Sequence, residues 1–328
     1  MITKEKERLE KFPHQTDEGP SNLSSYCTVA SGRDGYEASL LMHSIRLHSN
    51  KKIYLMADEE GLAHLQDEIP ENTDVSLISS KDMEERKAEY SASPSTIWAN
   101  CPKREAVGNQ AWLSYRMDVM AKAIKETGNT IFLDADVILI NPINCNFKSE
   151  LALSTQNGVC GGGYIYSSDP AFPENWRELF KSDLAIEATP AAADQVCGKC
   201  GDLCTSRLHK HHDTTLFGTG HNYGPWRVKL PPRLESDTDQ LLSEMGLSVN
   251  KDIYLDEGKG PEKLVSFHAH LQPKRGQRDS LYNLVRALYE CLKRSLNANH
   301  RRLMDFINDT YIPNAHSYGL GEANTVTV

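Results

Sequence analysis

Two aspartates separated by a single residue follow an apolar segment near the middle of the chain, in the stretch TIFLDADVILINPI. Residues 130–133 are β-branched or apolar and come after a Gly-Asn pair, so they predict a buried central strand. If the backbone stays extended beyond this strand, Asp134 and Asp136 share one face while Ala135 points to the other, because side chains alternate with a period of two. Two carboxylates held this close repel each other unless a cation lies between them.

This pair therefore predicts a site for a hard cation. Mg²⁺ and Mn²⁺ take oxygen ligands and commonly bind through one or two carboxylates, with phosphate oxygens and waters completing an octahedron. A diphosphate is the natural third component. The alternative, in which one aspartate caps a turn and the other is solvated, is less favoured because the segment continues apolar after the pair.

Composition limits the classes of protein to consider. A chain of 328 residues, 39% hydrophobic and 25% charged, forms one large globular domain or two modest ones. Lys and Arg number 36 against 45 Asp and Glu, a net charge of -9. This balance argues against a dedicated nucleic-acid binder, because neutralising phosphates requires a basic face.

The first twelve residues, MITKEKERLEKF, are charged throughout and predict no secretory signal, and no window of about 18 apolar residues predicts a membrane span. We therefore expect a cytoplasmic protein without a transmembrane segment. Its eight cysteines are expected to be reduced thiols or metal ligands rather than a disulfide framework.

Strands and helices alternate along the first half of the chain, which predicts a mainly parallel sheet. The expected strands there are residues 26–31, 52–58 and 74–79, and the expected helices are residues 36–48, 62–69, from 82 onward, and 110–127. Later strands are expected at residues 150–155, 161–168, 251–256 and 263–271, with helices at 173–181 and after Ser236 and Asp237. The carboxyl ends of parallel strands are where ligands bind in such sheets.

Two further regions stand apart from this pattern. From about 184 to 226 the periodicity breaks into CGKCGDLCTSRLHKHHD and FGTGHNYG, which we interpret as an insertion. Residues 280–308 predict a helical tail, with one apolar face formed by Leu284, Leu288, Leu292 and Leu296.

The aspartate pair and its setting resemble a glycosyltransferase of the GT-A fold, most closely the glycogenin-type (family 8-like) retaining family. The resemblance covers about two thirds of the chain, and it implies a Rossmann-like α/β fold with a mainly parallel sheet flanked by helices. The Cys/His-containing insertion and a C-terminal helical segment are additions. On this basis we expect a loose arm at 1–25, the transferase domain at 26–276 and the helical tail at 277–328.

The resemblance implies that Asp134 and Asp136 hold Mn²⁺, or Mg²⁺, against the diphosphate of a nucleotide-sugar, with a UDP-sugar expected. The family completes the metal site with a late histidine in an H-x-x-G-x-x-K arrangement. VSFHAHLQPKRG places Lys274 six residues after His268, although Leu271 stands where the glycine is expected. The third ligand is therefore His268 or, alternatively, His270; imidazole favours Mn²⁺ over Mg²⁺.

Other donor-binding residues follow from the same resemblance. TVASGRDGYEASLLMHSIRLH supplies Tyr36, Ser44 and His48 in the arrangement that binds the nucleoside in the family. In GVCGGGYIYSSD, Gly161 replaces the asparagine that the family carries beside the donor sugar. The glycines there allow either a close approach of the backbone to a ligand or a bulge. The remaining expected donor-binding residues are Ala30, Ser31, Arg116, Ala135, Gly162, Gly163 and Lys274.

An Asp-Gln pair opening a helix lies near the acceptor in the family, and this chain offers two. Asp239 and Gln240 are preferred because a helix start precedes them, with Asp194 and Gln195 as the alternative. In a retaining enzyme the pair would position the substrate and support a cationic sugar, whereas in an inverting enzyme Asp239 would be the general base. The acceptor, a glycan, protein, lipid or small molecule, stays open.

The insertion carries a second candidate site. Cys197, Cys200, Cys204 and His209 could bind a structural Zn²⁺, since the C-x-x-C start is typical of zinc modules. The alternative is a set of free thiols in a loop. If this cluster bound metal and the aspartates did not, the chain would be a non-catalytic zinc-binding scaffold.

Overall fold

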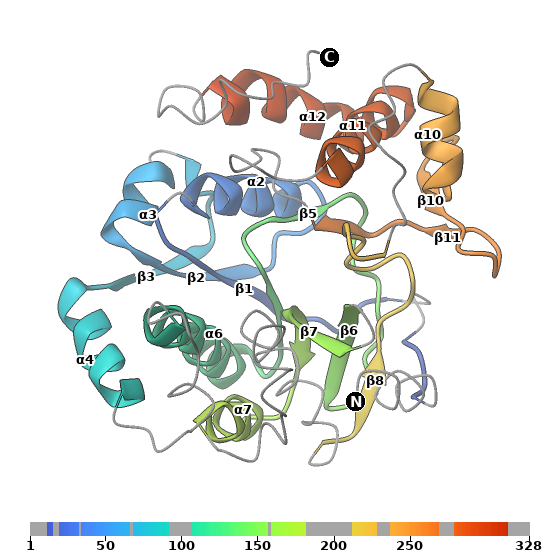
Figure 1. Ribbon diagram of the computed structural model, residues 1–328. Coiled ribbons are helices and arrows are strands. Elements are labelled where there is room, and N and C mark those ends of the chain that lie inside the picture. The colour runs from blue at the N-terminus through green and yellow to red at the C-terminus, as the bar shows by residue number, and fades with distance from the viewer. Residues whose placement is uncertain are drawn as a thin grey trace.

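The architecture is a central β-sheet covered by helices on both faces, shown in Figure 1 for a computed structural model of the chain. The structure describes residues 12–15, 20–32, 34–65, 68–91, 106–156, 159–181, 212–227, 237–268 and 279–313. Helices α2 and α3 cover one face of the sheet, and α4, α6 and α7 cover the other. This mixed α/β arrangement confirms the fold class expected from the alternation of strands and helices.

The main sheet has seven strands in the order β3-β2-β1-β4-β7-β6-β8. Their bounds are β1 (Ser25–Ala30), β2 (Lys52–Asp58), β3 (Thr73–Ile78), β4 (Thr130–Leu133), β6 (Leu151–Gln156), β7 (Val159–Ser167) and β8 (Thr214–Leu216). Neighbouring strands pair in parallel except at β7, which is antiparallel to both β4 and β6. The sheet is therefore mainly parallel, as predicted.

The helices that cover the sheet are α2 (Asp34–Arg46), α3 (Glu59–Leu65), α4 (Ser80–Ser91), α6 (Ala106–Thr127) and α7 (Phe172–Lys181). Strand β1 is buried along its whole length, Ser25 and Thr28 included. Tyr26 and Ala30 pack in a core cluster with residues of α2, whereas Cys27 and Val29 pack in a separate cluster with residues of α6. A strand buried on both faces cannot alternate between apolar and polar residues.

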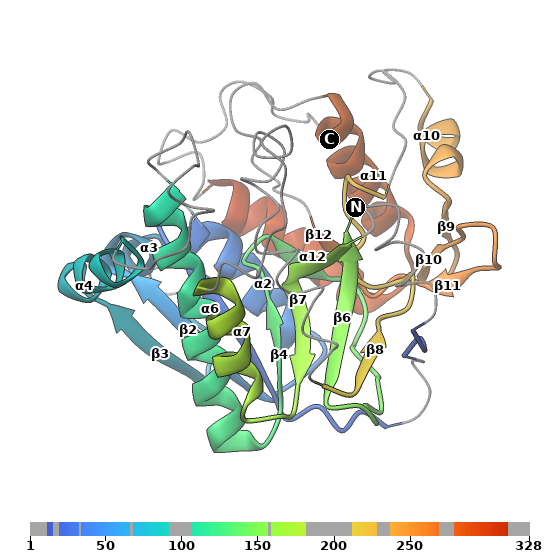
Figure 2. The same cartoon turned by 60° about the horizontal axis from the view of Figure 1, so that its bottom comes forward.

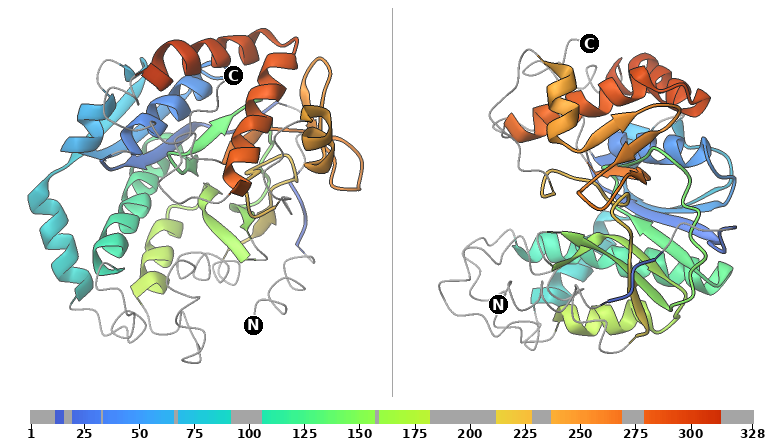
Figure 3. Two further views of the ribbon diagram at one scale, coloured as in Figure 1. Left: turned by 45° about the horizontal axis from the view of Figure 1, so that its top comes forward. Right: turned by 90° about the vertical axis from the view of Figure 1, so that its right-hand side faces the viewer.

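A second group of elements packs beside α2. It contains β9 (Leu247–Val249), β10 (Ile253–Leu255) and β11 (Glu262–Lys263), the helices α10 (Thr238–Glu244), α11 (Asp279–Arg294) and α12 (Ala298–Phe306), and the π-helical turn η4 (Ile307–Tyr311). Figure 3 shows α11 and α12 on the same side of the sheet as α2. Buried residues of α11 and α12 share one core cluster with Tyr36 and Leu40 of α2. The C-terminal helices thus stabilise the element that follows β1.

Two short strands form a separate two-stranded sheet that the sequence did not predict. Strand β5 (Val137–Leu139) pairs antiparallel with β12 (Ser266–His268), and His268 lies opposite Val137. The chain thus leaves the main sheet after β4 and meets a segment from far along the sequence. Figure 2 shows β12 beyond the end of β4.

Helix α10 begins as predicted from its sequence. Asp237 is the N-cap, and its side chain accepts hydrogen bonds from the backbone N–H groups of Asp239 and Gln240. The helix ends at Glu244, and Gly246 follows the C-cap Met245 with a φ of +68°, in the left-handed region that glycine adopts without strain.

The predicted helical tail differs from the structure in one respect. Leu284, Leu288 and Leu292 are buried, but Leu296 lies between α11 and α12 and is 71% exposed. The predicted four-leucine face is therefore wrong at its last position, because Arg294 ends α11 and Asn297 caps a new helix.

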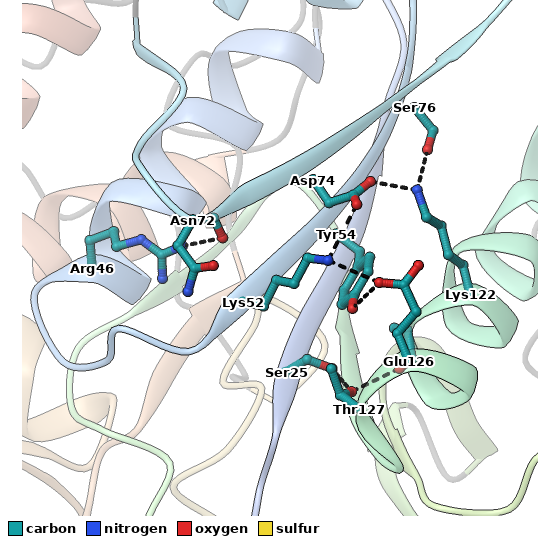
Figure 4. A network of polar contacts seen from close by, with 11 residues as sticks. Ser25, Arg46, Lys52, Tyr54, Asn72, Asp74, Ser76, Lys122, Glu126 and Thr127 are labelled. Atoms are coloured by element: carbon teal, nitrogen blue, oxygen red, sulfur yellow. Dashed lines mark hydrogen bonds and ion pairs between the residues drawn. The ribbon is translucent and has the colours of Figure 1, made fainter.

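Helix α6 is held against the sheet by the ion-pair network drawn in Figure 4. Lys52 of β2 lies 2.9 Å from Glu126 and 3.3 Å from Asp74, and Lys122 of α6 lies 2.5 Å from the same Asp74. The Tyr54 hydroxyl donates to Glu126 at 2.8 Å. These contacts join β2 and β3 to the helix that carries Arg116.

In the part of the chain that the structure describes, no helix combines the length and the apolar character needed to cross a bilayer. The described cysteines, Cys27, Cys145, Cys160 and Cys291, are buried and form no disulfide with one another.

Candidate functional site

Asp134 and Asp136 follow β4 at the carboxyl end of the sheet, where the topology of a parallel sheet places ligands. The backbone here is a turn, in which Val137 N–H donates to the Asp134 carbonyl at 3.0 Å. The predicted extended backbone is therefore wrong, because β5 must turn away from the main sheet to pair with β12. Ala135 is nevertheless buried in the core, and the two carboxylates still point to one place.

His268 completes this group. Strand β12 delivers it opposite Val137, the residue after Asp136. Its Nε2 lies 3.0 Å from Asp136 Oδ1 and 4.0 Å from Asp134 Oδ2. The side chains of Asp134, Asp136 and His268, called here the DDH group, are 19%, 13% and 10% exposed and can offer one ligand atom each within 4.8 Å of one another. The structure brings His268 to the two aspartates, whereas His270, the alternative third ligand, lies outside the described residues.

Asn222 determines which nitrogen of His268 faces the carboxylates. The Asn222 side chain donates through Nδ2 to Ser154 Oγ at 2.8 Å, which leaves its Oδ1 to accept from His268 Nδ1 at 2.6 Å. When its ring is neutral, His268 therefore carries its proton on Nδ1 and turns the lone pair of Nε2 toward Asp136. A lone pair facing a carboxylate oxygen at 3.0 Å is repulsive, and either a proton on Nε2 or a metal ion bound by both groups relieves this repulsion.

The distances within the DDH group fit an octahedral ion. With ligand–ion distances of about 2.0–2.2 Å, adjacent ligands of such an ion lie roughly 3 Å apart and opposite ligands roughly 4.2 Å apart. The separations of His268 Nε2 from the two carboxylates are 3.0 Å and 4.0 Å. A mixed set of two carboxylates and one imidazole suits Mn²⁺ better than Mg²⁺.

Arg116 provides the positive charge beside this group. Its Nη2 lies 2.8 Å from Asp134 Oδ1, and its guanidinium lies over the ring of Phe132 at 5.4 Å. The Nε–H of Arg116 is buried and has no hydrogen-bond partner. Asp118, two residues along the helix, faces away from Arg116 and binds Arg86 and Arg177 instead.

The glycine run of β7 explains how Asp134 fits against the sheet. A Cβ atom added at Gly163 would lie 2.0 Å from Asp134 Oδ2, and the Gly163 carbonyl accepts from Asp134 N–H at 2.8 Å. Gly162 is buried in the same strand. The register of β6 against β7 also shifts between Leu153 and Ser154. The bulge foreseen for these glycines is therefore present, and the group that approaches Gly163 closely is the Asp134 carboxylate.

The residues expected to contact the nucleoside lie at the end of β1 and in α2. Ala30 is fully buried, Ser31 begins the turn that leads into α2, and Tyr36 is 3% exposed. The Tyr36 hydroxyl contacts His64 Nδ1 at 2.8 Å, and the two rings lie 4.6 Å apart. Ser44 is buried and accepts from Leu139 N–H at 3.0 Å, so it ties α2 to β5.

Four residues of this region were missed by sequence reasoning. Asp58 accepts from the N–H groups of Gly32 at 3.0 Å and Gly61 at 2.7 Å, and so joins the ends of β1 and β2. The position of Asp58 at the end of an apolar strand could have identified it from the sequence. His64 and Trp226 had no such signal in the sequence. The Trp226 ring packs edge-on against the His268 ring, with 4.8 Å between the ring centroids. The buried Nε1–H of Trp226 has no hydrogen-bond partner within the chain. The missed residues are Asp58, His64, Asn222 and Trp226.

Asn222 had a weak signal in HNYG, since Asn tolerates the left-handed φ of +53° that it adopts here. The prediction of an insertion over 184–226 obscured it. In the structure Thr214–Leu216 form β8 of the main sheet, and Asn222 supports the DDH group. The described end of the predicted insertion therefore belongs to the sheet.

The Asp239–Gln240 pair lies on α10, beside β10 and α11 (Figure 1). The Asp239 side chain is 82% exposed and pairs with Arg294, while Gln240 Nε2 donates to Glu244 Oε1 at 2.8 Å. Neither residue is part of the DDH group. The alternative pair, Asp194 and Gln195, lies outside the described residues, as do Lys274, Cys197, Cys200, Cys204 and His209.

Comparison with known proteins gives a likeness in fold. No protein-family model matches this sequence, and neither does any curated protein. The crystal structure of mouse xyloside xylosyltransferase 1 in its apo form aligns with a TM-score of 0.45 and 10% identity, over 75% of this chain and 97% of that one. The glycosyltransferase GlyE of Streptococcus pneumoniae TIGR4 aligns with a TM-score of 0.33 and 13% identity, over 62% of this chain and 47% of that one. Both likenesses are remote, so the function of this chain is inferred from its own residues.

Proposed function

We propose that this chain is a metal-dependent enzyme acting on a nucleoside diphosphate derivative and, more narrowly, a GT-A glycosyltransferase. It would move a sugar from a UDP-sugar donor to an acceptor whose class the chain does not reveal. The observation that carries the proposal is the DDH group at the carboxyl end of β4, with the Nε2 lone pair of His268 turned toward Asp136 by Asn222.

A divalent ion fits the DDH group because, without a cation, hydrogen-bond acceptor atoms of its three side chains face one another. Asp134 and Asp136 are both acceptors when ionised, and His268 Nε2 is an acceptor when Asn222 receives the proton of Nδ1. When bound, such an ion supplies the positive charge that stabilises a leaving diphosphate.

Two buried donors beside the DDH group suit an anionic ligand. The Arg116 Nε–H and the Trp226 Nε1–H both lack a hydrogen-bond partner within the chain. A buried donor without a partner is unfavourable by about 1–3 kcal/mol, and a phosphate oxygen would satisfy it. Arg116 would therefore hold Asp134 through Nη2 and place its positive charge beside the diphosphate.

The segment after β1 would line the nucleoside side of the donor site. Asp58 holds the Gly32 and Gly61 N–H groups, so the loop that follows β1 and the start of α3 form one rigid wall. Tyr36 and His64 lie in contact along this wall, and we assign them to the nucleoside side of the donor site.

We favour retention of configuration at the sugar. Inversion requires a general base close to the acceptor hydroxyl. Asp239, the residue expected in that role, is exposed and engaged by Arg294. In a retaining reaction the departing diphosphate can take the acceptor proton, and residues of the chain need only bind and orient the two substrates.

Calorimetric titration with UDP, GDP and CDP, each with and without Mn²⁺, tests the proposal. Wild type should bind UDP tightly only with Mn²⁺, and Asp136→Ala should weaken that binding by at least about 100-fold, the scale on which metal sites respond to loss of supporting groups. Asp305→Ala, which removes an exposed carboxylate on α12, is the matched control and should bind like wild type.

Binding of UDP with metal would justify screening UDP-sugars for hydrolysis and then acceptors, with the anomeric product analysed for stereochemistry. If no nucleotide bound under any metal condition to folded wild type, the donor-site proposal would be overturned. The zinc-binding scaffold suggested by Cys197 and its neighbours would then be the reading to pursue.

A further inference from the structure

A second group of metal-ligating side chains lies at the other edge of the main sheet. Glu150, Asp169 and His212, called here the EDH group, can offer one ligand atom each within 4.8 Å of one another. Strand β7 runs antiparallel to β4, so its last residue, Ser167, pairs with Thr130 at the start of β4. Between Gly163 and Asp169 the chain advances by roughly 20 Å. The EDH group is therefore separate from the DDH group.

Three neighbouring strands bring the EDH group together. Glu150 precedes β6, Asp169 follows β7, and His212 comes shortly before β8. The register aligns these ends, because Leu151 of β6 lies opposite Ser167 of β7 on one side and Thr214 of β8 on the other. Strands β6, β7 and β8 lie side by side in Figures 1 and 2.

The central histidine of this group points to a ligand. The side chain of His212 is 1% exposed, and Asp169 Oδ2 lies 2.8 Å from its Nδ1. Despite this short separation, Nδ1 makes no hydrogen bond, so the oxygen is displaced from the direction in which the ring nitrogen points. Adjacent ligands of a metal ion have this relation, since they lie roughly 3 Å apart and each points at the ion rather than at the other.

The surroundings leave the other ligand atoms available. Asp169 uses Oδ1 to accept from Ala171 N–H at 2.8 Å, which orients Oδ2 toward His212. Asn175 Nδ2 lies 3.3 Å from His212 Nε2. Ligation through Nδ1 places the ring proton on Nε2, so Asn175 must then present its amide oxygen, which a half-turn of the amide allows.

We propose that Glu150, Asp169 and His212 bind a divalent transition-metal ion that holds the ends of β6, β7 and β8 together. One imidazole and two carboxylates favour Zn²⁺ over Mn²⁺, and both over Mg²⁺. The EDH group lies at the opposite ends of the strands from the DDH group, away from the proposed donor site. We therefore assign its ion a structural role. It fixes the short strand β8, after which the chain reaches Asn222.

Cobalt binding to the full-length chain tests the proposal. The Asp136→Ala chain is used so that the DDH group is disabled, and bound Co²⁺ is counted after equilibrium dialysis and followed by its visible absorption. Adding Glu150→Gln or His212→Gln should remove one equivalent of Co²⁺. Adding Asp213→Asn should remove none, because this exposed neighbour changes the same charge outside the EDH group. Equal Co²⁺ binding with and without Glu150→Gln would overturn the proposal.

Two further readouts identify where the metal binds. Cobalt bound by cysteines gives an intense near-ultraviolet charge-transfer band, whereas cobalt bound by the EDH group does not. A bound ion that shows this band, is lost in Cys197→Ser and is kept in Glu150→Gln belongs to the cysteines and overturns the proposal. Zn²⁺ should also raise the thermal midpoint of the Asp136→Ala chain but not that of the same chain carrying Glu150→Gln, whose exposed substitution leaves the fold intact. Equal shifts would mean that Zn²⁺ stabilises the chain without Glu150 and would overturn the proposal.

Discussion

The DDH and EDH groups contain the same kinds of ligand at opposite edges of one sheet, and they differ in accessibility and in neighbours. All three DDH side chains are between 10% and 19% exposed, so each can reach a ligand that enters and leaves. In the EDH group, His212 is 1% exposed while Glu150 is exposed. The DDH group also has Arg116 beside it and lies at the carboxyl end of the parallel strands. Position in the sheet and adjacent charge, rather than ligand type, therefore separate a candidate catalytic site from a structural one.

The largest effect is expected from Gly163→Ala. The added methyl group would lie 2.0 Å from Asp134 Oδ2 and so displace a DDH carboxylate. Mn²⁺-dependent UDP binding should fall by at least about 100-fold, and the free energy of unfolding by about 1–3 kcal/mol. Calorimetry and urea unfolding measure the two effects.

Gly218→Ala is the matched control, because the atom nearest to its added methyl group is Glu262 Oε2 at 3.4 Å. Binding of Co²⁺ by the EDH group should be unchanged in both glycine variants. If Gly163→Ala bound UDP like wild type, Asp134 would not be a ligand in its present position.

The next effect concerns the nitrogen of His268 that faces the ion. Asn222→Ala removes the acceptor for Nδ1–H, and Mn²⁺ affinity should fall by about 10–100-fold. Asn222→Asp retains an acceptor at the same place and tolerates the left-handed backbone, so its affinity should stay within a few-fold of wild type. Electron paramagnetic resonance of free Mn²⁺ measures both. Equal loss in the two variants would contradict the role assigned to this hydrogen bond.

A smaller effect is expected at the diphosphate. Arg116→Met removes a charged donor, and UDP affinity in Mn²⁺ should fall by roughly 10–100-fold, equivalent to about 1.5–3 kcal/mol. Arg86→Met removes an arginine of similar burial that binds Asp118 instead. It should lower the free energy of unfolding without changing UDP affinity. A comparable loss of UDP affinity in both variants would show that Arg116 acts through the fold alone.

The effect of pH on the free energy of unfolding must be measured separately from the effect of losing bound metal. Burial lowers the pKa of His48 from 6.5 to about 4, and burial also lowers the pKa values of His43 and His300. A lowered histidine pKa means that the unfolded chain binds more protons below pH 6.5, so this contribution is present above pH 6.5 and is lost as pH falls toward 4. For His48 it amounts to about 3 kcal/mol.

Urea unfolding between pH 7.5 and 4.5 in the presence of EDTA measures this contribution without metal. His48→Gln should flatten the dependence relative to wild type. An unchanged slope in His48→Gln would place the acid sensitivity elsewhere in the fold.

Local signals in the sequence predicted most elements well. The apolar run of β2 and the Asp237 cap of α10 were found where the structure has them, because strand periodicity and capping depend on neighbouring residues. The extended backbone at Asp134 and the apolar face through Leu296 were not borne out. In both cases a turn or a new helix start, set by packing with distant elements, interrupted a regular local pattern.

The sequence predicted the candidate metal ligands of the site but not the residues that support them. Asp134 and Asp136 are separated by one residue, and His268 ends an apolar segment, so residue type and spacing were sufficient to propose them. Asn222, Trp226 and the EDH group have no common sequence spacing. They come together only because strands from separate parts of the chain pair side by side.

By itself, the sequence determined the alternation of strands and helices, the aspartate pair at the end of a buried strand and the glycines that leave room for it. These properties depend on side-chain period and backbone freedom over a few residues. Only the tertiary structure decided that His268 lies opposite Val137, that Asn222 orients its ring, and that Glu150, Asp169 and His212 meet at the other edge. Strand register and pairing between distant segments decide these contacts, and no local pattern encodes them.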